Sequence, residues 1–180
     1  MFLYKEKICS FYDDNDDTFR VGYLVDIDEQ FAIFNIYTTR GYEDGLYLTR
    51  KEDIFRVDYE NVYINRILKL SKLIDDNFCK IHLESETTNL KEVLLRHARK
   101  TKLIVTVRLT TEDTLTGFVY DINDEFTILN VLDEDGKPDG KSAIKTEFID
   151  RIWCDSGYER NVHLLYKAEK DSLFYNSATE

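Results

Sequence analysis

Cysteine, proline and glycine are scarce in this chain of 180 residues, which has 3, 1 and 7 of them. The cysteines, Cys9, Cys79 and Cys154, are odd in number, widely spaced and form no Cys-x-x-Cys pair. This pattern suits neither a disulfide framework nor a cysteine-based zinc site. We therefore expect free thiols in a reducing compartment, and a cytoplasmic location.

Long apolar runs and an excess of basic residues are also missing. No stretch reaches the roughly 20 apolar residues of a membrane-spanning helix, and the N-terminus lacks the apolar run of a signal peptide. The 24 Lys and Arg are outnumbered by 35 Asp and Glu, which gives a net charge of −11. This charge disfavours RNA and anionic lipid, although a local basic patch for RNA stays open. The sequence predicts no membrane contact.

Aromatic residues, by contrast, are plentiful, with 12 Tyr and 11 Phe. The hydrophobic share of 43% is enough for a packed core, and the length suits one medium domain or two small ones. Many aromatic residues with a single proline are more typical of β-rich barrels than of helical bundles.

The chain repeats itself. Residues 22–70 align without a gap with residues 117–165, at a constant offset of 95. They share far more identities than unrelated segments do at typical residue frequencies. We interpret this as the duplication of one domain. The identical pairs include Gly22 and Gly117, Asp26 and Asp121, Phe31 and Phe126, Asn35 and Asn130, Glu52 and Glu147, Arg56 and Arg151, and Leu70 and Leu165.

Each copy is expected to form a small closed barrel of five short strands, because closure removes exposed sheet edges. Gly117 stands where its strand must bend or lie close to another backbone. The run "FTILNVL" is apolar on both faces, which predicts burial on both sides. The strands expected in the second copy are 102–109, 115–122, 126–132, 141–145 and 149–154, with "TEF" bridging the last two.

Helices are expected to flank the barrels. Before the second barrel, "TTNLKEVLLRHARK" has an apolar stripe, and Asn89 with Glu92 resembles a capping box. A helical stripe also follows each barrel. The fold class is thus mainly β with flanking helices, in two duplicated barrels. We expect residues 1–75 to hold the first barrel and its C-terminal helix, 76–88 a linker, 89–168 the second barrel with leading and trailing helices, and 169–180 a tail.

The second copy resembles the Sm-like small barrel, a helix followed by five bent strands with a glycine in the second. "GFVYDINDEFTILN" resembles the first Sm motif, and "SAIKTEFIDRIWC" resembles the second, where two short strands and a turn complete the ring interface. SH3-like barrels share these patterns. The resemblance covers each repeat. It implies a strongly bent sheet, association through barrel edges, and RNA binding as the commonest function.

The loops that bind RNA in that family differ here. The first usually carries Asp-x-hydrophobic-Asn, but this chain reads Asp124-Glu-Phe-Thr and Asp28-Glu-Gln-Phe. The second is often Arg-Gly, where "KTEF" and "RKED" have no glycine. Together with the acidic charge, this favours a non-enzymatic interaction or assembly module of tandem Sm-like barrels, with a protein partner or self-association. The alternative is an RNA-binding regulator of Sm type.

The stretch "VLDEDGKPDGKSAIK" suggests calcium, since acidic residues crowd its two glycines. The first copy reads "TTRGYEDG" there, and the second lacks the bidentate Glu of an EF-hand. Both copies keep Gly-x-x-Asp-Gly, which indicates a turn with positive φ at glycine and an Asx-type bond from Asp. The predicted turn residues are Gly41, Asp44, Gly45, Gly136, Asp139 and Gly140.

Candidate residues for RNA or anions are few. The only basic cluster lies near the end of a helix, where positive charge also suits the helix dipole. The two repeated arginines could bind phosphate or pair with Glu52 and Glu147, and the repeated asparagines could contact a base or bond to turn backbone. We favour the structural roles. The candidates are Arg96, Arg99, Lys100, Lys102, Arg56, Arg151, Asn35 and Asn130.

No catalytic constellation emerges. The histidines, His82, His97 and His163, lack ligand spacing and a partnered nucleophile, and His97 is expected to pack on a helix. "YDDNDDT" is expected to be a solvated hairpin loop, and Trp153 a core or interface residue. There is no phosphate-binding glycine loop or metal motif. We therefore expect no enzyme activity, no metal and no cofactor.

Overall fold

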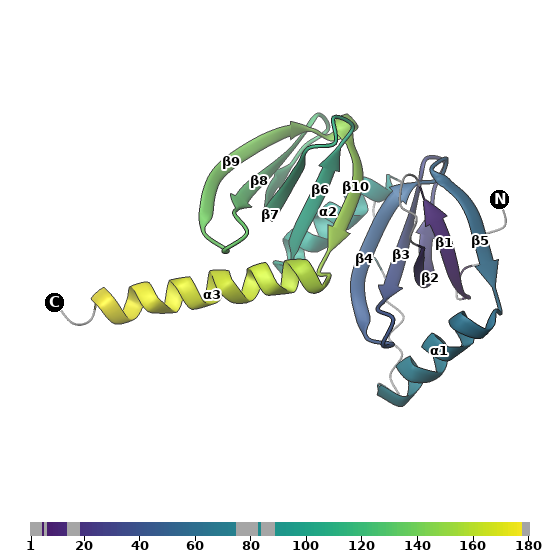
Figure 1. Cartoon of the computed structure of the whole chain (residues 1–180). Coiled ribbons are helices and arrows are strands. Elements are labelled where there is room, and N and C mark those ends of the chain that lie inside the picture. The colour runs from purple at the N-terminus through teal and green to yellow at the C-terminus, as the bar shows by residue number, and fades with distance from the viewer. Residues whose placement is uncertain (1–4, 6, 14–18, 75–82, 84–88, 178–180) are drawn as a thin grey trace. The chain divides into compact units, whose positions relative to one another are not determined.

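The computed structural model describes residues 5, 7–13, 19–74, 83 and 89–177 and is mainly β (Figure 1). The chain divides into two compact units, Met1–Leu94 and Leu95–Glu180. The expected linker, 76–88, lies outside the described residues apart from Leu83, as do Cys79 and His82. No helix in the described ranges combines the length and the apolar character that crossing a membrane requires.

Each unit contains five strands in the same order along the chain. The first has β1 (Ile8–Asp13), β2 (Arg20–Ile27), β3 (Phe31–Tyr37), β4 (Glu43–Arg50), β5 (Ile54–Tyr59) and the helix α1 (Val62–Ile74). After α2 (Leu90–Thr101) follow β6 (Ile104–Leu109), β7 (Thr114–Ile122), β8 (Phe126–Leu132), β9 (Pro138–Lys145), the 3-10 turn η1 (Thr146–Phe148), β10 (Ile149–Cys154) and α3 (Gly157–Ser177). The predicted bounds of β8, η1 and β10 are confirmed. The helix α3 continues into the segment expected as a tail.

The prediction of closed barrels is wrong. The antiparallel order is β5-β1-β2-β3-β4 in the first unit and β10-β6-β7-β8-β9 in the second. Within each described unit, the two outermost strands do not pair with each other. The reason lies at the corner after the fourth strand. In the second unit β10 follows η1 and pairs with β6, and among the described strands β9 pairs with β8 alone. The sheet stays open, although it is strongly curved (Figure 1).

The curvature arises at matching places in the two sheets. The register shifts between Leu24 and Asp26 in the first unit and between Val119 and Asp121 in the second. A β-bulge of this kind bends a strand and increases its twist. Near the bulge in the second unit, a Cβ on Gly117 would lie 2.1 Å from the carbonyl oxygen of Asn130. The predicted close approach of backbones at this glycine is confirmed.

The helices cover the sheets as the sequence indicated. The side chain of Asn89 accepts hydrogen bonds from the backbone N–H groups of Lys91 and Glu92, so the predicted N-cap of α2 is confirmed. In Figure 1, α1 and α3 each lie across one end of their own sheet. The core under α1 contains Ile8, Val21, Ile64 and Ile67, and the core under α3 contains Ile104, Leu132 and Val162.

Burial of the third strand differs between the units. In the first unit, β3 is buried along nearly its whole length, as expected of a strand that is apolar on both faces. In the second unit, Phe126, Ile128 and Asn130 on β8 are only half-buried, so the predicted burial on both sides is wrong there. One face of the second sheet is therefore more open to solvent than its sequence suggests.

Candidate functional site

The first glycine of each Gly-x-x-Asp-Gly segment, Gly41 or Gly136, lies in a turn as predicted, but Gly45 and Gly140 lie inside β4 and β9. All four glycines have positive φ: 84° and 79° at Gly41 and Gly45, and 77° and 83° at Gly136 and Gly140. The expected Asx-type bond, however, comes from a different residue. In the second unit Asp133 Oδ1 accepts hydrogen bonds from the backbone N–H groups of Asp135 and Lys137, at 3.0 and 2.7 Å.

The first unit closes the same turn with a threonine hydroxyl. Thr38 Oγ1 accepts hydrogen bonds from the backbone N–H groups of Arg40 and Tyr42. Asp44 and Asp139, which were expected to make the turn bond, stand inside β4 and β9. The acidic residue that first suggested a cation, Asp133, thus serves the turn.

Gly41 and Gly136, the first glycine of each segment, also allow close packing against the trailing helix, which the sequence did not reveal. A Cβ on Gly136 would lie 2.5 Å from the backbone nitrogen of Tyr166 and 2.8 Å from the carbonyl oxygen of Val162, both on α3. A Cβ on Gly41 would lie 2.8 Å from the nitrogen of Ser71 on α1. Each turn therefore lies directly against the backbone of the trailing helix, an approach that only glycine permits.

The two repeated arginines have different environments. Arg56 Nη2 lies 2.8 Å from Asp58 Oδ2, and its guanidinium lies over the ring of Tyr12. The expected pairing with Glu52 is wrong, because the carboxylate of Asp58 lies two residues along the same strand. The hydrogen bond that Arg56 donates to Asp58 raises the pKa of Arg56. Arg151 is buried, which removes it from contact with a phosphate in solution.

The remaining candidates do not converge on an anion site. Asn35 is buried, and its amide donates to the hydroxyl of Tyr37 at 3.4 Å rather than to a turn backbone. Asn130 is half-buried on β8. The basic residues of α2 and the residue after it, Arg96, Arg99, Lys100 and Lys102, are exposed, and Arg99 Nη1 lies 2.9 Å from Asp121 Oδ1.

A buried polar cluster in the first unit was not predicted. Asp13 has no exposed side-chain surface, although the sequence placed it in a solvated acidic loop. It accepts a hydrogen bond from Arg20 Nη1 at 2.6 Å and another from the hydroxyl of Tyr47. The guanidinium of Arg20 also lies 4.6 Å from the centroid of the Tyr47 ring. We call these three residues the polar plug.

Aromatic rings fill the space beside the polar plug. Phe11 and Phe34 are stacked with their ring centroids 3.9 Å apart, and the Tyr47 ring lies 6.1 Å from Phe11. All three rings are fully buried. These rings therefore fill the interior of the first sheet beside the polar plug.

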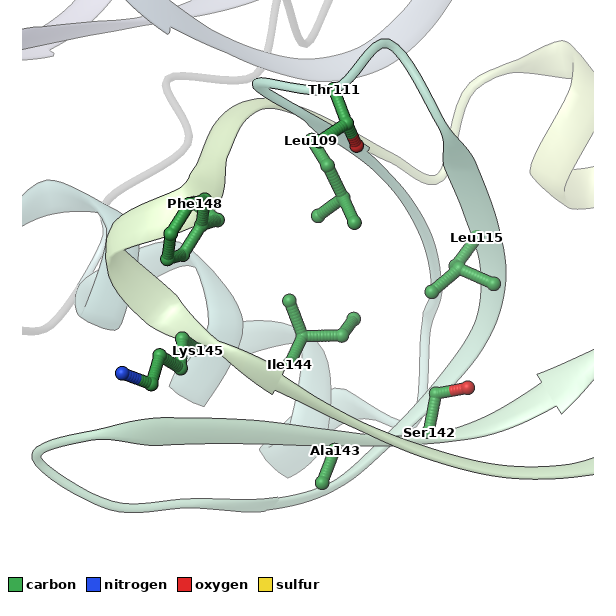
Figure 2. Close-up of a pocket in the computed structure, with 8 residues that line it drawn as sticks. All are labelled: Leu109, Thr111, Leu115, Ser142, Ala143, Ile144, Lys145 and Phe148. Carbon is green, nitrogen blue, oxygen red and sulfur yellow. The ribbon is translucent and has the colours of Figure 1, made fainter.

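The second unit has a cavity of about 350 Å³ at the corresponding end. Figure 2 shows Leu109, Leu115 and Ile144 pointing into this hollow from β6, β7 and β9. Ala143 and Lys145 point away from it, and the ring of Phe148 stands at its side. We call it the β9 pocket. Its full lining is Leu109, Thr111, Leu115, Ser142, Ala143, Ile144, Lys145 and Phe148.

The β9 pocket and the polar plug occupy equivalent positions. The strand registers match Asp13 with Leu109, because each lies opposite the first residue of the last strand of its unit. Likewise Arg20 matches Leu115, since these lie opposite Phe11 and Val107. Tyr47 matches Ser142, opposite Phe34 and Leu129. The charged and aromatic residues that fill the first sheet are thus leucine, leucine and serine in the second.

The titratable side chains that the structure describes do not form a second candidate site beside the β9 pocket. Burial raises the pKa of the Cys9 thiol to about 12 and also raises that of Cys154. Both thiols are free and buried. Burial lowers the pKa of His97, a half-buried residue as the packing interpretation requires. Among the described residues, no three His, Cys, Asp or Glu side chains are grouped so that they could hold a metal ion.

Sequence reasoning missed the β9 pocket because no single stretch encodes it. Its walls come from three strands, the β6–β7 loop and η1, and apart from Lys145 each lining residue is an ordinary apolar or small polar side chain. A comparison of the repeats at Tyr47 and Ser142 carries the only signal, a large ring in one copy and a small side chain in the other. No protein-family model and no curated protein matches the chain.

Proposed function

We propose that this protein is a non-enzymatic interaction module that binds another polypeptide chain at β9 and the β9 pocket. The observation that carries the proposal is an apolar hollow beside a strand that pairs on one side only. An unpaired strand edge offers backbone N–H and C=O groups to an added strand, and pockets beside it select side chains. Within the pocket lining, Lys145 is the one charged residue, and it points away from the hollow (Figure 2).

We also propose that the two units are tandem Sm-like modules produced by duplication, in a cytoplasmic protein. The support is the resemblance of "GFVYDINDEFTILN" and "SAIKTEFIDRIWC" to the two Sm motifs, together with the repeat at an offset of 95 residues. Their sheets are open, so association through strand edges is the expected mode of assembly.

Sizing by static light scattering tests the proposed assembly. The apparent mass should rise above the monomer value of 21.3 kDa as protein concentration increases, because free strand edges can pair between chains. A mass that stays at 21.3 kDa at every concentration would rule out assembly through edges and leave only a different protein as the partner.

The second candidate function, RNA binding of Sm type, is supported by the exposed basic residues of α2. We expect fluorescence anisotropy with short single-stranded RNA at low salt to show no binding tighter than about 100 µM, because the net charge of −11 opposes contact with phosphates. The measurement should be repeated with Arg96→Glu/Lys100→Glu. Micromolar binding that weakens steeply with salt and disappears in this variant would favour the RNA-binding alternative.

A further inference from the structure

We propose that the β9 pocket receives an aromatic side chain, preferably phenylalanine, from an extended segment of the partner. This inference rests on the proposed function and adds the chemistry of the partner. It follows from what the equivalent space contains in the first unit, from the strand beside the pocket, and from Leu109, the lining residue that matches Asp13.

The first unit shows which group fits this space. There the Tyr47 ring lies beside the stacked rings of Phe11 and Phe34. The matching residues in the second unit are Ser142, Val107 and Leu129, so three rings are replaced by smaller side chains on the same sheet framework. A cavity of about 350 Å³ lies there. Apolar walls of this kind favour a ring, since an aromatic side chain buries a large apolar surface.

The strand beside the pocket indicates an extended polypeptide rather than a free small molecule. Four consecutive residues of β9, from Ser142 to Lys145, line the pocket, and β8 is the one strand paired with β9 in the part of the chain that the structure describes. Ala143 and Lys145 are exposed. A segment added to the open edge of β9 would gain backbone hydrogen bonds there while one of its side chains enters the hollow.

Leu109, the lining residue that matches Asp13, selects between phenylalanine and tyrosine. In the first unit the Tyr47 hydroxyl donates to the buried carboxylate of Asp13. The matching residue in the second unit is Leu109, which offers no acceptor. A phenol buried in the same orientation would lose its hydrogen bonds to water and would find no carboxylate at the place of Asp13, whereas a phenyl ring has no such bonds to lose.

The test uses the full-length protein and four blocked peptides, acetyl-Thr-Val-Xaa-Val-Thr-amide, with Phe, Tyr, Leu or Ala at the central position. Methyl NMR of Leu109, Leu115 and Ile144 reports on the pocket. We expect the Phe peptide to shift these signals and to bind at least about tenfold more tightly than the Ala peptide, with Tyr weaker than Phe. Equal affinity of the Phe and Ala peptides, or unmoved methyl signals, would overturn the proposal.

A variant that refills the pocket provides the second arm. Ser142→Tyr places the ring of the first unit into the second, and it should abolish the preference for Phe. Lys69→Tyr adds the same ring at an exposed position of α1 in the first unit, outside β9 and the pocket lining, and should bind like the unmodified protein. Ser142→Val fills less space and serves where Ser142→Tyr does not fold, as judged by circular dichroism. A Phe preference that survives in folded, refilled variants contradicts the proposal.

The source of the ring is settled with N-acetyl-phenylalanine amide, which has the ring but no strand to add. We expect it to bind more weakly than the Phe peptide by at least about tenfold, because it lacks the backbone partners of β9. Equal binding would mean a small aromatic ligand and would overturn the assignment to a polypeptide. If the peptides fail while light scattering still shows concentration-dependent assembly, the pocket inference falls, whereas the proposed assembly through strand edges stands.

Discussion

Asp13→Ala is expected to destabilise the first unit by about 3–5 kcal/mol, because it removes one partner of a buried ion pair. The carboxylate of Asp13 is fully buried and accepts from both Arg20 and Tyr47. Without it, a mostly buried guanidinium and a buried phenol hydroxyl lose their acceptor at the same time. Urea unfolding followed by circular dichroism measures the loss, and hydrogen exchange at β1 assigns it to the first unit.

The matched control is Asp58→Ala, which also removes an aspartate paired with an arginine in the same unit. The Arg56–Asp58 pair is much more exposed than the polar plug, so its removal should cost far less. The double variant Asp13→Leu/Arg20→Leu, which installs the residues of the second unit, should lose less stability than Asp13→Ala alone. Equal losses for Asp13→Ala and Asp58→Ala would show that the polar plug contributes no special stability.

Gly136→Ala should lower the free energy of unfolding by roughly 3 kcal/mol, the second largest effect that we expect. The new Cβ would lie 2.5 Å from the backbone nitrogen of Tyr166, so the turn or α3 must move. The positive φ of 77° adds a conformational cost of about 1–2 kcal/mol for any residue with a Cβ. Thermal and urea unfolding of the full-length chain provide the measurement.

Gly140→Ala separates the cost of positive φ from the cost of the close contact with α3. Gly140 has a similar φ of 83°, but a Cβ there would meet no atom within 4 Å. Its substitution should therefore cost only the conformational part, about 1–2 kcal/mol. If both alanine variants are destabilised equally, close packing of the turn against α3 does not contribute, and positive φ alone explains why glycine occurs in both repeats.

The repeat made much of the fold predictable. Alternating apolar residues and a shared offset were sufficient to place β8, η1 and β10 at their observed bounds. The same pattern did not justify the prediction of a closed barrel. Alternation of apolar residues shows which face of a strand is buried, but it does not show which strands pair at the edges of the sheet. Pairing of β10 with β6 rather than with β9 depends on the three-dimensional path of η1, which periodicity does not specify.

The candidate site was harder to predict for a different reason. Asp13 lies in an acidic run, and a run of carboxylates ordinarily indicates exposure to solvent. Its burial depends on Arg20 and Tyr47, which come from two other strands and approach it only in the folded sheet. The same holds for the β9 pocket, where the informative quantity is a difference in side-chain size between residues 95 positions apart. Identical residues at matching positions of the repeat can still differ in burial, because Arg56 is exposed and Arg151 is buried.

The hollow in the second sheet also has a thermodynamic meaning for the protein on its own. Apolar side chains that line an open hollow face solvent instead of packed neighbours, and they lack the contacts that a packed interior supplies. The first sheet avoids this loss by placing Tyr47 where the second sheet has Ser142. The interior of the second sheet is therefore packed less completely than the interior of the first sheet. An aromatic side chain from a bound partner would fill the interior of the second sheet as Tyr47 fills the interior of the first.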